Sequence, residues 1–177
     1  MIYYVEGCTC SGKSTLAREL VSYYEGFELA PEHTPDHERM KDLNLSEKQK
    51  IIFFDFLNHF ETLRQTGKNY ICGFSPWGVI PFSYAICNST AVMGAENFVK
   101  KWSLLNAQFT EICDNYFNMN RENIQCIAFL SLPKNAIKKR LIARNRAGDD
   151  LWNDRFINEL IMQYNWLFAE LKKRTFI

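Results

Sequence analysis

The stretch IYYVEGCTCSGKST, residues 2–15, decides the fold, because an apolar run leads directly into a glycine-containing loop. Residues 2–5 are aromatic or β-branched, which predicts a buried strand. Four residues match the pattern G-x-x-x-x-G-K-[ST] without a mismatch: Gly7, Gly12, Lys13 and Ser14. A chance match in an ordinary turn is the alternative. The strand before the loop and a helix predicted over residues 13–24 favour a nucleotide-binding loop.

The chemistry of such a loop assigns tasks to its residues. Glycines allow the backbone to curl so that its N–H groups point at phosphate oxygens, and the N-terminal end of the following helix adds positive charge. Lys13 would reach the β- and γ-phosphates of a nucleotide, and the Ser14 hydroxyl would complete the shell of a Mg²⁺ ion. ATP and Mg²⁺ are therefore the expected cofactors.

Length and composition narrow the class of protein. A chain of 177 residues that is 47% hydrophobic suits a single domain over residues 1–177. The net charge of +1 gives no electrostatic reason to expect stable binding to nucleic acid or to an acidic membrane. We expect no membrane span and no signal peptide, because no segment is long enough and the chain begins with a strand. Six scattered cysteines fit reduced thiols and a cytoplasmic location.

Strand-like and helix-like segments alternate along the rest of the chain, which predicts an α/β fold with a mostly parallel sheet. Further strands are expected at residues 27–30, 70–74 and 126–130. The phosphate-binding loop would then lie at the carboxyl end of the first strand, where open α/β sheets bind their ligands. Residues 175–177 leave room for only a stub of a fifth strand.

The helices have their own signals. Ser46 with Gln49 forms a predicted capping box at the start of a long helix. Residues 82–117 are expected to be helical, with a break near Gly94. Pro133 suits the first turn of a helix that carries KNAIKKRLIARNR. A closing helix has an apolar face made of Trp152, Phe156, Leu160, Tyr164, Leu167 and Leu171.

Three arginines near the C-terminal end of the chain form a candidate catalytic cluster. Arg140 and Arg144 are four residues apart and so lie on one helix face, and Arg146 follows just beyond. Phosphoryl transfer spreads negative charge over oxygens, and arginines on a closing segment neutralise that charge while excluding water. We predict a short arginine-bearing lid at about residues 144–151. A solvated basic helix face is the alternative.

Glu32 is the candidate general base. It follows the second predicted strand, and in this topology it would lie beside the phosphate-binding loop, where a carboxylate can accept the proton of an attacking hydroxyl. A solvent-exposed loop acid is the alternative, and Asp36 and Glu38 are rival acids in the same loop.

At this point the chain resembles a known family. YVEGCTCSGKSTL is similar to the start of the deoxynucleoside kinases and their relatives, the thymidylate kinases. CIAFLSLPKNAIKKRLIARNRAGDDLWNDRFINELIMQYNWLFAEL resembles their fourth strand, lid and closing helix. The resemblance implies a P-loop kinase-type parallel sheet of four or five strands flanked by helices. It also implies that Glu32 is the base, that Lys13 and the three arginines are catalytic, and that the ATP phosphates are bound by Gly7, Cys8, Thr9, Cys10, Ser11, Gly12, Lys13, Ser14 and Thr15.

The chain also departs from that family. The third strand should be followed by a motif of the type D/E-R-S, but CGFSPWG has Gly73 and Phe74 at these places and keeps only Ser75. The family's base-reading glutamine is not evident in the helix after Ser46, where Asp55 or Asn58 is the nearest polar candidate. Three aromatic residues are candidates to stack on a nucleobase, with burial in the core as the alternative: Phe56, Trp77 and Phe82.

The leading hypothesis is an ATP- and Mg²⁺-dependent kinase that phosphorylates the 5′-hydroxyl of a deoxynucleoside. The alternative enzyme is a deoxynucleoside monophosphate kinase of the thymidylate type, whose acceptor is already a phosphate. The alternative from another class is a nucleotide-binding protein without kinase activity, which the missing D/E-R pair suggests. The expected partner is a small nucleoside or nucleotide, and a homodimer is an open option.

Overall fold

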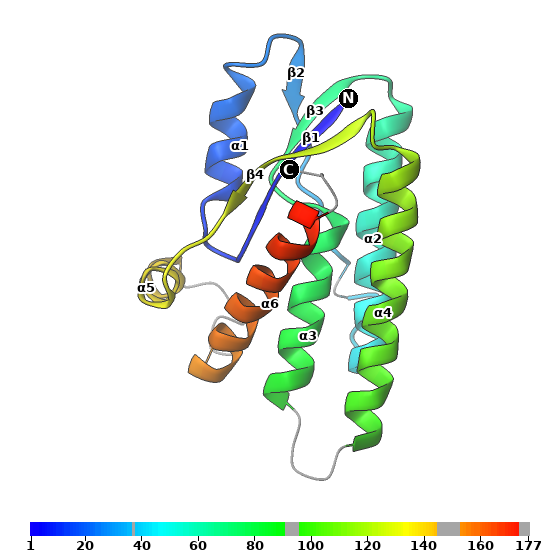
Figure 1. Cartoon of the computed structure of the whole chain (residues 1–177), viewed down its shortest axis with the longest axis vertical. Helices are drawn as coiled ribbons and strands as arrows, with labels where there is room; N and C mark the ends of the chain where they lie inside the picture. Colours follow the sequence, from blue (N-terminus) through cyan, green and yellow to red (C-terminus); the bar gives the residue numbers. More distant parts are fainter. Residues whose placement is uncertain (37, 91–95, 145–152, 174–177) are drawn as a thin grey trace.

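The computed structural model describes residues 1–36, 38–90, 96–144 and 153–173. Four strands form a sheet in the order β2–β3–β1–β4, and every pair of neighbouring strands is parallel. Figure 1 shows the strands in the upper half of the molecule, with the long helices running along and below them. The strands are β1 (Ile2–Gly7), β2 (Phe27–Leu29), β3 (Asn69–Cys72) and β4 (Ile124–Leu130).

The predicted α/β fold and parallel sheet are confirmed, with small differences at the strand ends. β1 lies between β3 and β4, and Tyr4 is in register with Cys72 on one side and with Cys126 on the other. β3 ends at Cys72 rather than at Phe74. The chain turns away at Gly73, whose backbone lies so close to α1 (Lys13–Val21) that an added Cβ would be 3.2 Å from the Cα atom of Ser14.

Each strand is followed along the chain by at least one helix. Helix α3 (Val79–Thr90) packs against both α4 (Glu96–Met119) and the closing helix α6 (Asp154–Lys173), and the three lie on the side of the sheet away from α1 (Figure 1). The predicted break near Gly94, the residue Trp152 and the stub at residues 175–177 lie outside the described residues. The helices are α1 (Lys13–Val21), α2 (Leu45–Gln65), α3 (Val79–Thr90), α4 (Glu96–Met119), α5 (Lys134–Arg144) and α6 (Asp154–Lys173), with a short 3-10 turn η1 at Pro76–Gly78.

The start of α2 corrects one prediction. The N-cap is Asn44, whose side chain accepts a hydrogen bond from the backbone N–H of Glu47 at 3.1 Å. The Glu47 carboxylate accepts one in return from the N–H of Asn44 at 3.0 Å. The predicted box of Ser46 and Gln49 is therefore wrong, because Asn44 provides the capping oxygen two residues earlier. Gln49 is left free for another role, and only 3% of it is exposed.

The sheet is covered by apolar side chains on both faces. Val5 and Ile71 point to one face and pack with Ala17 of α1. The larger core lies on the opposite face, where Phe53 of α2 and Phe109 of α4 stack with their ring centroids 4.1 Å apart. Burial of this many apolar groups is the main favourable term in folding, and it holds the ends of β1 and β3 in fixed places.

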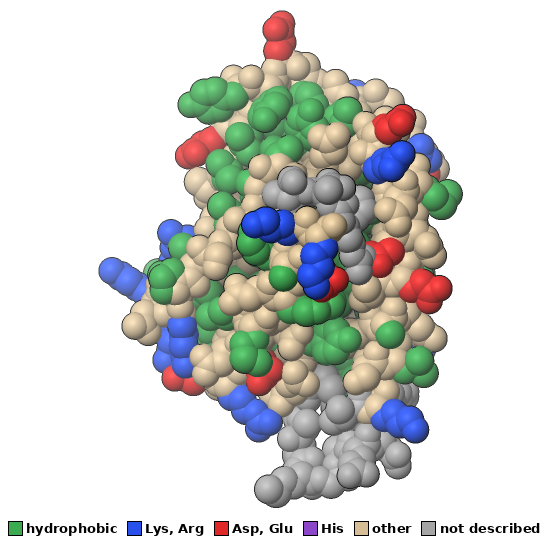
Figure 2. All heavy atoms as spheres, viewed as in Figure 1, with side chains coloured by type: hydrophobic (Ala, Val, Ile, Leu, Met, Phe, Trp, Pro, Cys, Tyr) green, Lys and Arg blue, Asp and Glu red, His purple; other side chains and the backbone are tan. Residues whose placement is uncertain are grey.

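Two observations concern the expectation that the protein binds neither a membrane nor nucleic acid. No described helix is both long enough and apolar enough to cross a membrane. Figure 2 shows the Lys and Arg side chains of one face dispersed over the described surface, with acidic side chains between them.

Candidate active site

The phosphate-binding loop connects the end of β1 to the start of α1. Gly7 has φ 143° and Gly12 has φ 103°, in the region that favours glycine. A Cβ atom at Gly7 would lie 2.2 Å from the carbonyl oxygen of Leu130 in β4, so a side chain does not fit there. Cys10 has φ 60°, a conformation that costs energy for a residue with a side chain and that concentrates at functional sites.

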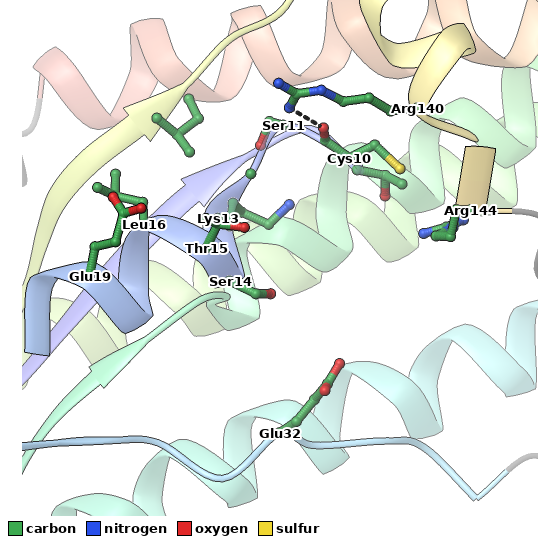
Figure 3. Close-up of a pocket in the computed structure, with 13 residues that line it drawn as sticks. Cys10, Ser11, Lys13, Ser14, Thr15, Leu16, Glu19, Glu32, Arg140 and Arg144 are labelled. Carbon is green, nitrogen blue, oxygen red and sulfur yellow. Dashed lines mark hydrogen bonds between the residues drawn. The ribbon is translucent and has the colours of Figure 1, made fainter. Parts of the chain in front are cut away.

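Two cations converge on this loop from different helices. Lys13 Nζ donates hydrogen bonds to the carbonyl oxygens of Gly7 at 2.7 Å and Cys8 at 2.9 Å. Arg140 Nη1, from α5, donates to the carbonyl oxygen of Cys10 at 2.8 Å. Figure 3 shows this last contact as a dashed line. Burial lowers the pKa of Lys13, and the nearby carboxylate of Glu6 partly opposes that effect.

A cavity of about 740 Å³ opens in front of the loop. Its lining includes residues 9–16 together with Glu32, Arg140 and Arg144. Figure 3 shows Glu32 on the opposite wall, with its carboxylate directed into the space that faces Ser14 and Lys13. The structure thus brings together a loop, two arginines and an acid that are far apart in the sequence. Arg146 and most of the predicted lid lie outside the described residues.

A second cavity, of about 530 Å³, adjoins the first between the loop and Phe56 in the middle of α2. Glu32, Lys13 and Ser14 line both cavities. The second one is also lined by His33, Phe56, Gly73 and Phe74, together with Arg18 and Leu29 of β2.

A third cavity, of about 230 Å³, is largely apolar and also reaches Lys13. Phe56 and Phe82, two of the aromatic residues singled out in the sequence, line it together with Phe74. Its polar lining residues are Glu6, Gln49, Ser75 and Tyr164. An apolar cavity with a few convergent polar groups is the usual form of a small-molecule site.

Gln49 was missed as a site residue because its spacing from Ser46 suggested a cap. The structure places it on the cavity side of α2, and its Oε1 atom is buried without a hydrogen-bond partner among the described residues. Buried polar atoms are nearly always hydrogen-bonded, so this unpaired atom makes Gln49 a candidate to contact a ligand.

Glu6 was missed because it ends an otherwise apolar strand. Only 1% of it is exposed, and its carboxylate accepts hydrogen bonds from the N–H of Gly7 at 2.9 Å and from the Ser75 hydroxyl. Burial raises its pKa, although the charge of Lys13 and the two hydrogen bonds act in the opposite direction. An acid between an apolar run and the first loop glycine was the available signal.

Gly78 and Tyr164 also lie near the Glu6 carboxylate. A Cβ atom at Gly78 would lie 3.0 Å from Glu6 Oε1, so the backbone of η1 runs directly past the carboxylate. The Tyr164 hydroxyl donates a hydrogen bond to the Gly78 carbonyl at 3.2 Å. Burial, together with the nearby Glu6 carboxylate, raises the pKa of Tyr164 well above its ordinary value.

Two other candidates lie away from the three cavities. Trp77 is fully buried in the larger core, where its ring centroid is 5.8 Å from that of Phe117, so the core alternative applies to it. It was singled out because an aromatic residue in an irregular segment resembles a base-stacking residue, but η1 turns its ring inward. Asp55 is half-buried on α2 and is not part of the lining of any of the three.

The fold and the loop together define a class. A parallel α/β sheet with a G-x-x-x-x-G-K-S loop after its first strand, faced by an arginine-bearing helix, is the architecture of the P-loop kinases. No protein-family model matches the chain, and no curated protein matches it in sequence.

Solved structures resemble the chain over nearly its whole length. Deoxyadenosine kinase from M. mycoides with bound dATP matches with a TM-score of 0.61 and 18% identity, covering 98% of this chain and 87% of that one. The same enzyme with its products dCMP and a flexible dCDP gives 0.60 and 17%, with 97% and 85% covered. Thymidylate kinase from Candida albicans gives 0.52 and 17%, with 97% and 79% covered. At these identities the likeness establishes a fold shared with nucleoside and nucleotide kinases.

Proposed function

We propose that this protein is a deoxynucleoside kinase that transfers the γ-phosphate of ATP to the 5′-hydroxyl of its substrate. One observation carries the proposal. Glu32 faces Ser14 and Lys13 across a cavity, and an apolar cavity with buried polar groups reaches the same lysine. The likeness to kinases whose structures hold dATP or dCMP supports it.

The loop is the phosphate-binding part of the site. Lys13 and Arg140 are now bound to loop carbonyl oxygens, and both can turn to phosphate oxygens, which are stronger acceptors because they are charged. Arg144, which lines the same cavity, adds a third positive charge. Together they would neutralise the charge that develops as the γ-phosphoryl group leaves the β-phosphate oxygen.

Ser14 fits the role of a Mg²⁺ ligand. It is exposed at the start of α1 beside the loop, and Gly73 provides no side chain against it. Mg²⁺ in kinase sites keeps several waters and binds phosphate oxygens, so one protein hydroxyl is enough. When bound, the ion would neutralise part of the phosphate charge and hold the phosphates in one orientation.

Glu32 is the proposed general base. The carboxylate takes the proton of the 5′-hydroxyl, the hydroxyl oxygen forms a bond to the γ-phosphorus, and the bond from that phosphorus to the bridging oxygen of ADP breaks. A hydroxyl is a weak nucleophile near pH 7, and such a base typically contributes about 10²–10⁴-fold to the rate. The position of Glu32 on the wall shared by the first two cavities suits this role.

The third cavity would hold the nucleobase. Phe56, Phe74 and Phe82 provide aromatic surface for it, and Gln49 provides an amide that can both donate and accept a hydrogen bond. Pairing the buried Gln49 Oε1 atom with a donor on the base would remove the cost of leaving it unpaired.

One observation favours the monophosphate kinase as the second candidate. Arg18 lines the second cavity with Lys13 and could hold an acceptor phosphate there. Glu32 lies in the same cavity, however, and its negative charge would repel that phosphate. A nucleotide-binding protein without kinase activity is the remaining alternative.

A transfer assay tests these alternatives. Labelled ATP and Mg²⁺ are supplied with a panel of deoxynucleosides and, separately, with the matching monophosphates. We expect labelled product from at least one deoxynucleoside. Product from monophosphates alone would show the second candidate to be correct, and ATP binding without any transfer would favour the binding protein.

A further inference from the structure

Glu32 lies in a segment that has little support of its own. Residues 31–35 form neither helix nor strand. Their neighbours are anchored, because the Ala30 N–H donates to Ile71 of β3 at 2.9 Å and the Asp36 carboxylate accepts from the Arg39 N–H at 3.1 Å. Between these anchors, the segment makes one hydrogen bond to the described residues, and that bond involves His59.

His59 of α2 contacts the residues on both sides of Glu32. Its Nε2 atom lies 3.2 Å from the carbonyl oxygen of Pro31. Its ring is stacked on the ring of His33, with centroids 5.0 Å apart and planes inclined by 23°. One side chain therefore holds the residue before the proposed base and the residue after it.

The surroundings hold the His59 ring in turn. Phe74 lies against it at a centroid distance of 5.7 Å, and Phe56 meets the His33 ring edge to face at 4.9 Å. A carbonyl oxygen only accepts hydrogen bonds, so the His59 Nε2 atom carries a proton and donates it to Pro31. Burial lowers the pKa of His59, and a charge on His33 would lower it further, which favours the neutral ring.

We propose that His59 is a positioning residue for catalysis, which fixes Glu32 at the acceptor hydroxyl by holding Pro31 and His33. The inference rests on the proposed function of Glu32 as the base. A general base must bring its own oxygen within about 2.6–3.2 Å of the hydroxyl oxygen whose proton it takes. Misplacement by roughly 1 Å can cost about a hundredfold in rate. A loop that lost its contact with His59 would spread the carboxylate over many positions.

Kinetic measurements on His59 variants of the wild-type chain and of a Glu32→Gln chain separate this role from a merely structural one. His59→Phe keeps an aromatic ring for the stack but removes the N–H donor, and His59→Gln keeps a donor but removes the ring. Each is made in the wild-type chain and in a Glu32→Gln chain. Lys50→Gln, at an exposed position of α2, is the matched control.

In the wild-type background, we expect His59→Phe to lower kcat for a deoxynucleoside by roughly tenfold or more, with the KM for ATP unchanged. His59→Gln should retain more activity, because the donor to Pro31 is kept. In the Glu32→Gln background both changes should have almost no further effect, because the base they position is absent. Equal losses in both backgrounds would overturn the inference.

A second measurement does not depend on activity. Backbone ¹⁵N heteronuclear NOE values of Glu32 and His33 report motion on the picosecond-to-nanosecond timescale. They should fall in His59→Phe and stay unchanged in Lys50→Gln. Unchanged values in both variants would contradict the inference whatever the enzyme does. If the NOE values fall in His59→Phe but the wild type transfers phosphate to no deoxynucleoside, then His59 does hold the segment in place and the proposed function is rejected instead.

Discussion

The Ser75 hydroxyl donates a hydrogen bond to the buried carboxylate of Glu6, and this contact joins the end of β1 to the segment that follows β3. Ser75 is the part of the expected D/E-R-S motif that the chain keeps. Although Gly73 and Phe74 replace the acid and the arginine, the site still contains a buried acid near Lys13, supplied by a different strand.

Replacing Glu6 by glutamine should change how stability depends on pH. Burial raises the pKa of Glu6 above its ordinary 4.5, so the folded protein binds this proton more tightly than the unfolded chain. The protonated Glu6 side chain thereby stabilises the folded protein. This contribution is fully present below the pKa that Glu6 has in the unfolded chain, and it is lost as the pH rises through the pKa that Glu6 has in the folded protein. Glutamine stays neutral throughout. The free energy of unfolding of Glu6→Gln, minus that of the wild type, should therefore grow above about pH 4.5.

Urea denaturation at a series of pH values measures this difference. Glu25→Gln, which removes an exposed carboxylate, is the control. A difference for Glu6→Gln that stayed flat or shrank with rising pH would show that the buried acid is compensated by Lys13 and Ser75 at every pH.

Replacing Gln49 by methionine should weaken binding of the deoxynucleoside without lowering the stability of the protein. Methionine has a similar length and no polar atom, so the buried Oε1 atom without a partner is removed. We expect the free protein to be as stable as the wild type or more stable by about 1 kcal/mol. The KM for the deoxynucleoside should rise while the KM for ATP stays constant. A nucleoside KM that did not move would place the base elsewhere.

Arg140 should contribute to the catalytic rate more than to ATP binding. It reaches the loop from α5 and donates to the Cys10 carbonyl, beside the expected phosphates. Arg140→Ala should lower kcat more than it raises the KM for ATP, because transferring charge is stabilised mainly in the transition state. Arg140→Lys should restore little, since the planar fork is lost. Steady-state kinetics measures kcat and the KM for ATP of both variants. Full activity of Arg140→Lys would contradict this prediction.

Lys13→Ala should abolish transfer while the protein stays folded. The ammonium group is bound by the Gly7 and Cys8 carbonyl oxygens rather than packed in the core. Its loss removes the positive charge that would stabilise the transferring phosphoryl group. Circular dichroism should be unchanged and labelled product absent. A variant with near-normal turnover would refute the assignment of the phosphate-binding loop.

The fold was largely predictable because its strongest signals are local. The apolar run of β1 and the glycine spacing of the loop lie within one short stretch, and the parallel sheet follows from the alternation of strands and helices. The error at the start of α2 is also local, since Asn44 and Ser46 are both good caps and only the backbone decides between them.

The site was predictable only in part, because contacts between distant segments have no local signal. The bond between Glu6 and Ser75 joins residues that are 69 positions apart, and His59 lies 28 positions from Pro31. Gln49 looked like a capping residue until the cap was found at Asn44. Trp77 and Phe82 looked alike in the sequence, yet one is in the core and the other lines a cavity.

The central claim is that Glu32 takes the proton of a deoxynucleoside 5′-hydroxyl. The most direct test is the rate of labelled phosphate transfer from ATP to a deoxynucleoside, measured for the wild type and for Glu32→Gln under saturating ATP. Glutamine keeps the size and polarity of the side chain but cannot accept the proton. We predict a loss of roughly a hundredfold or more with ATP affinity unchanged. Near-normal turnover by Glu32→Gln would contradict the account and favour a monophosphate acceptor, whose attacking oxygen needs no base.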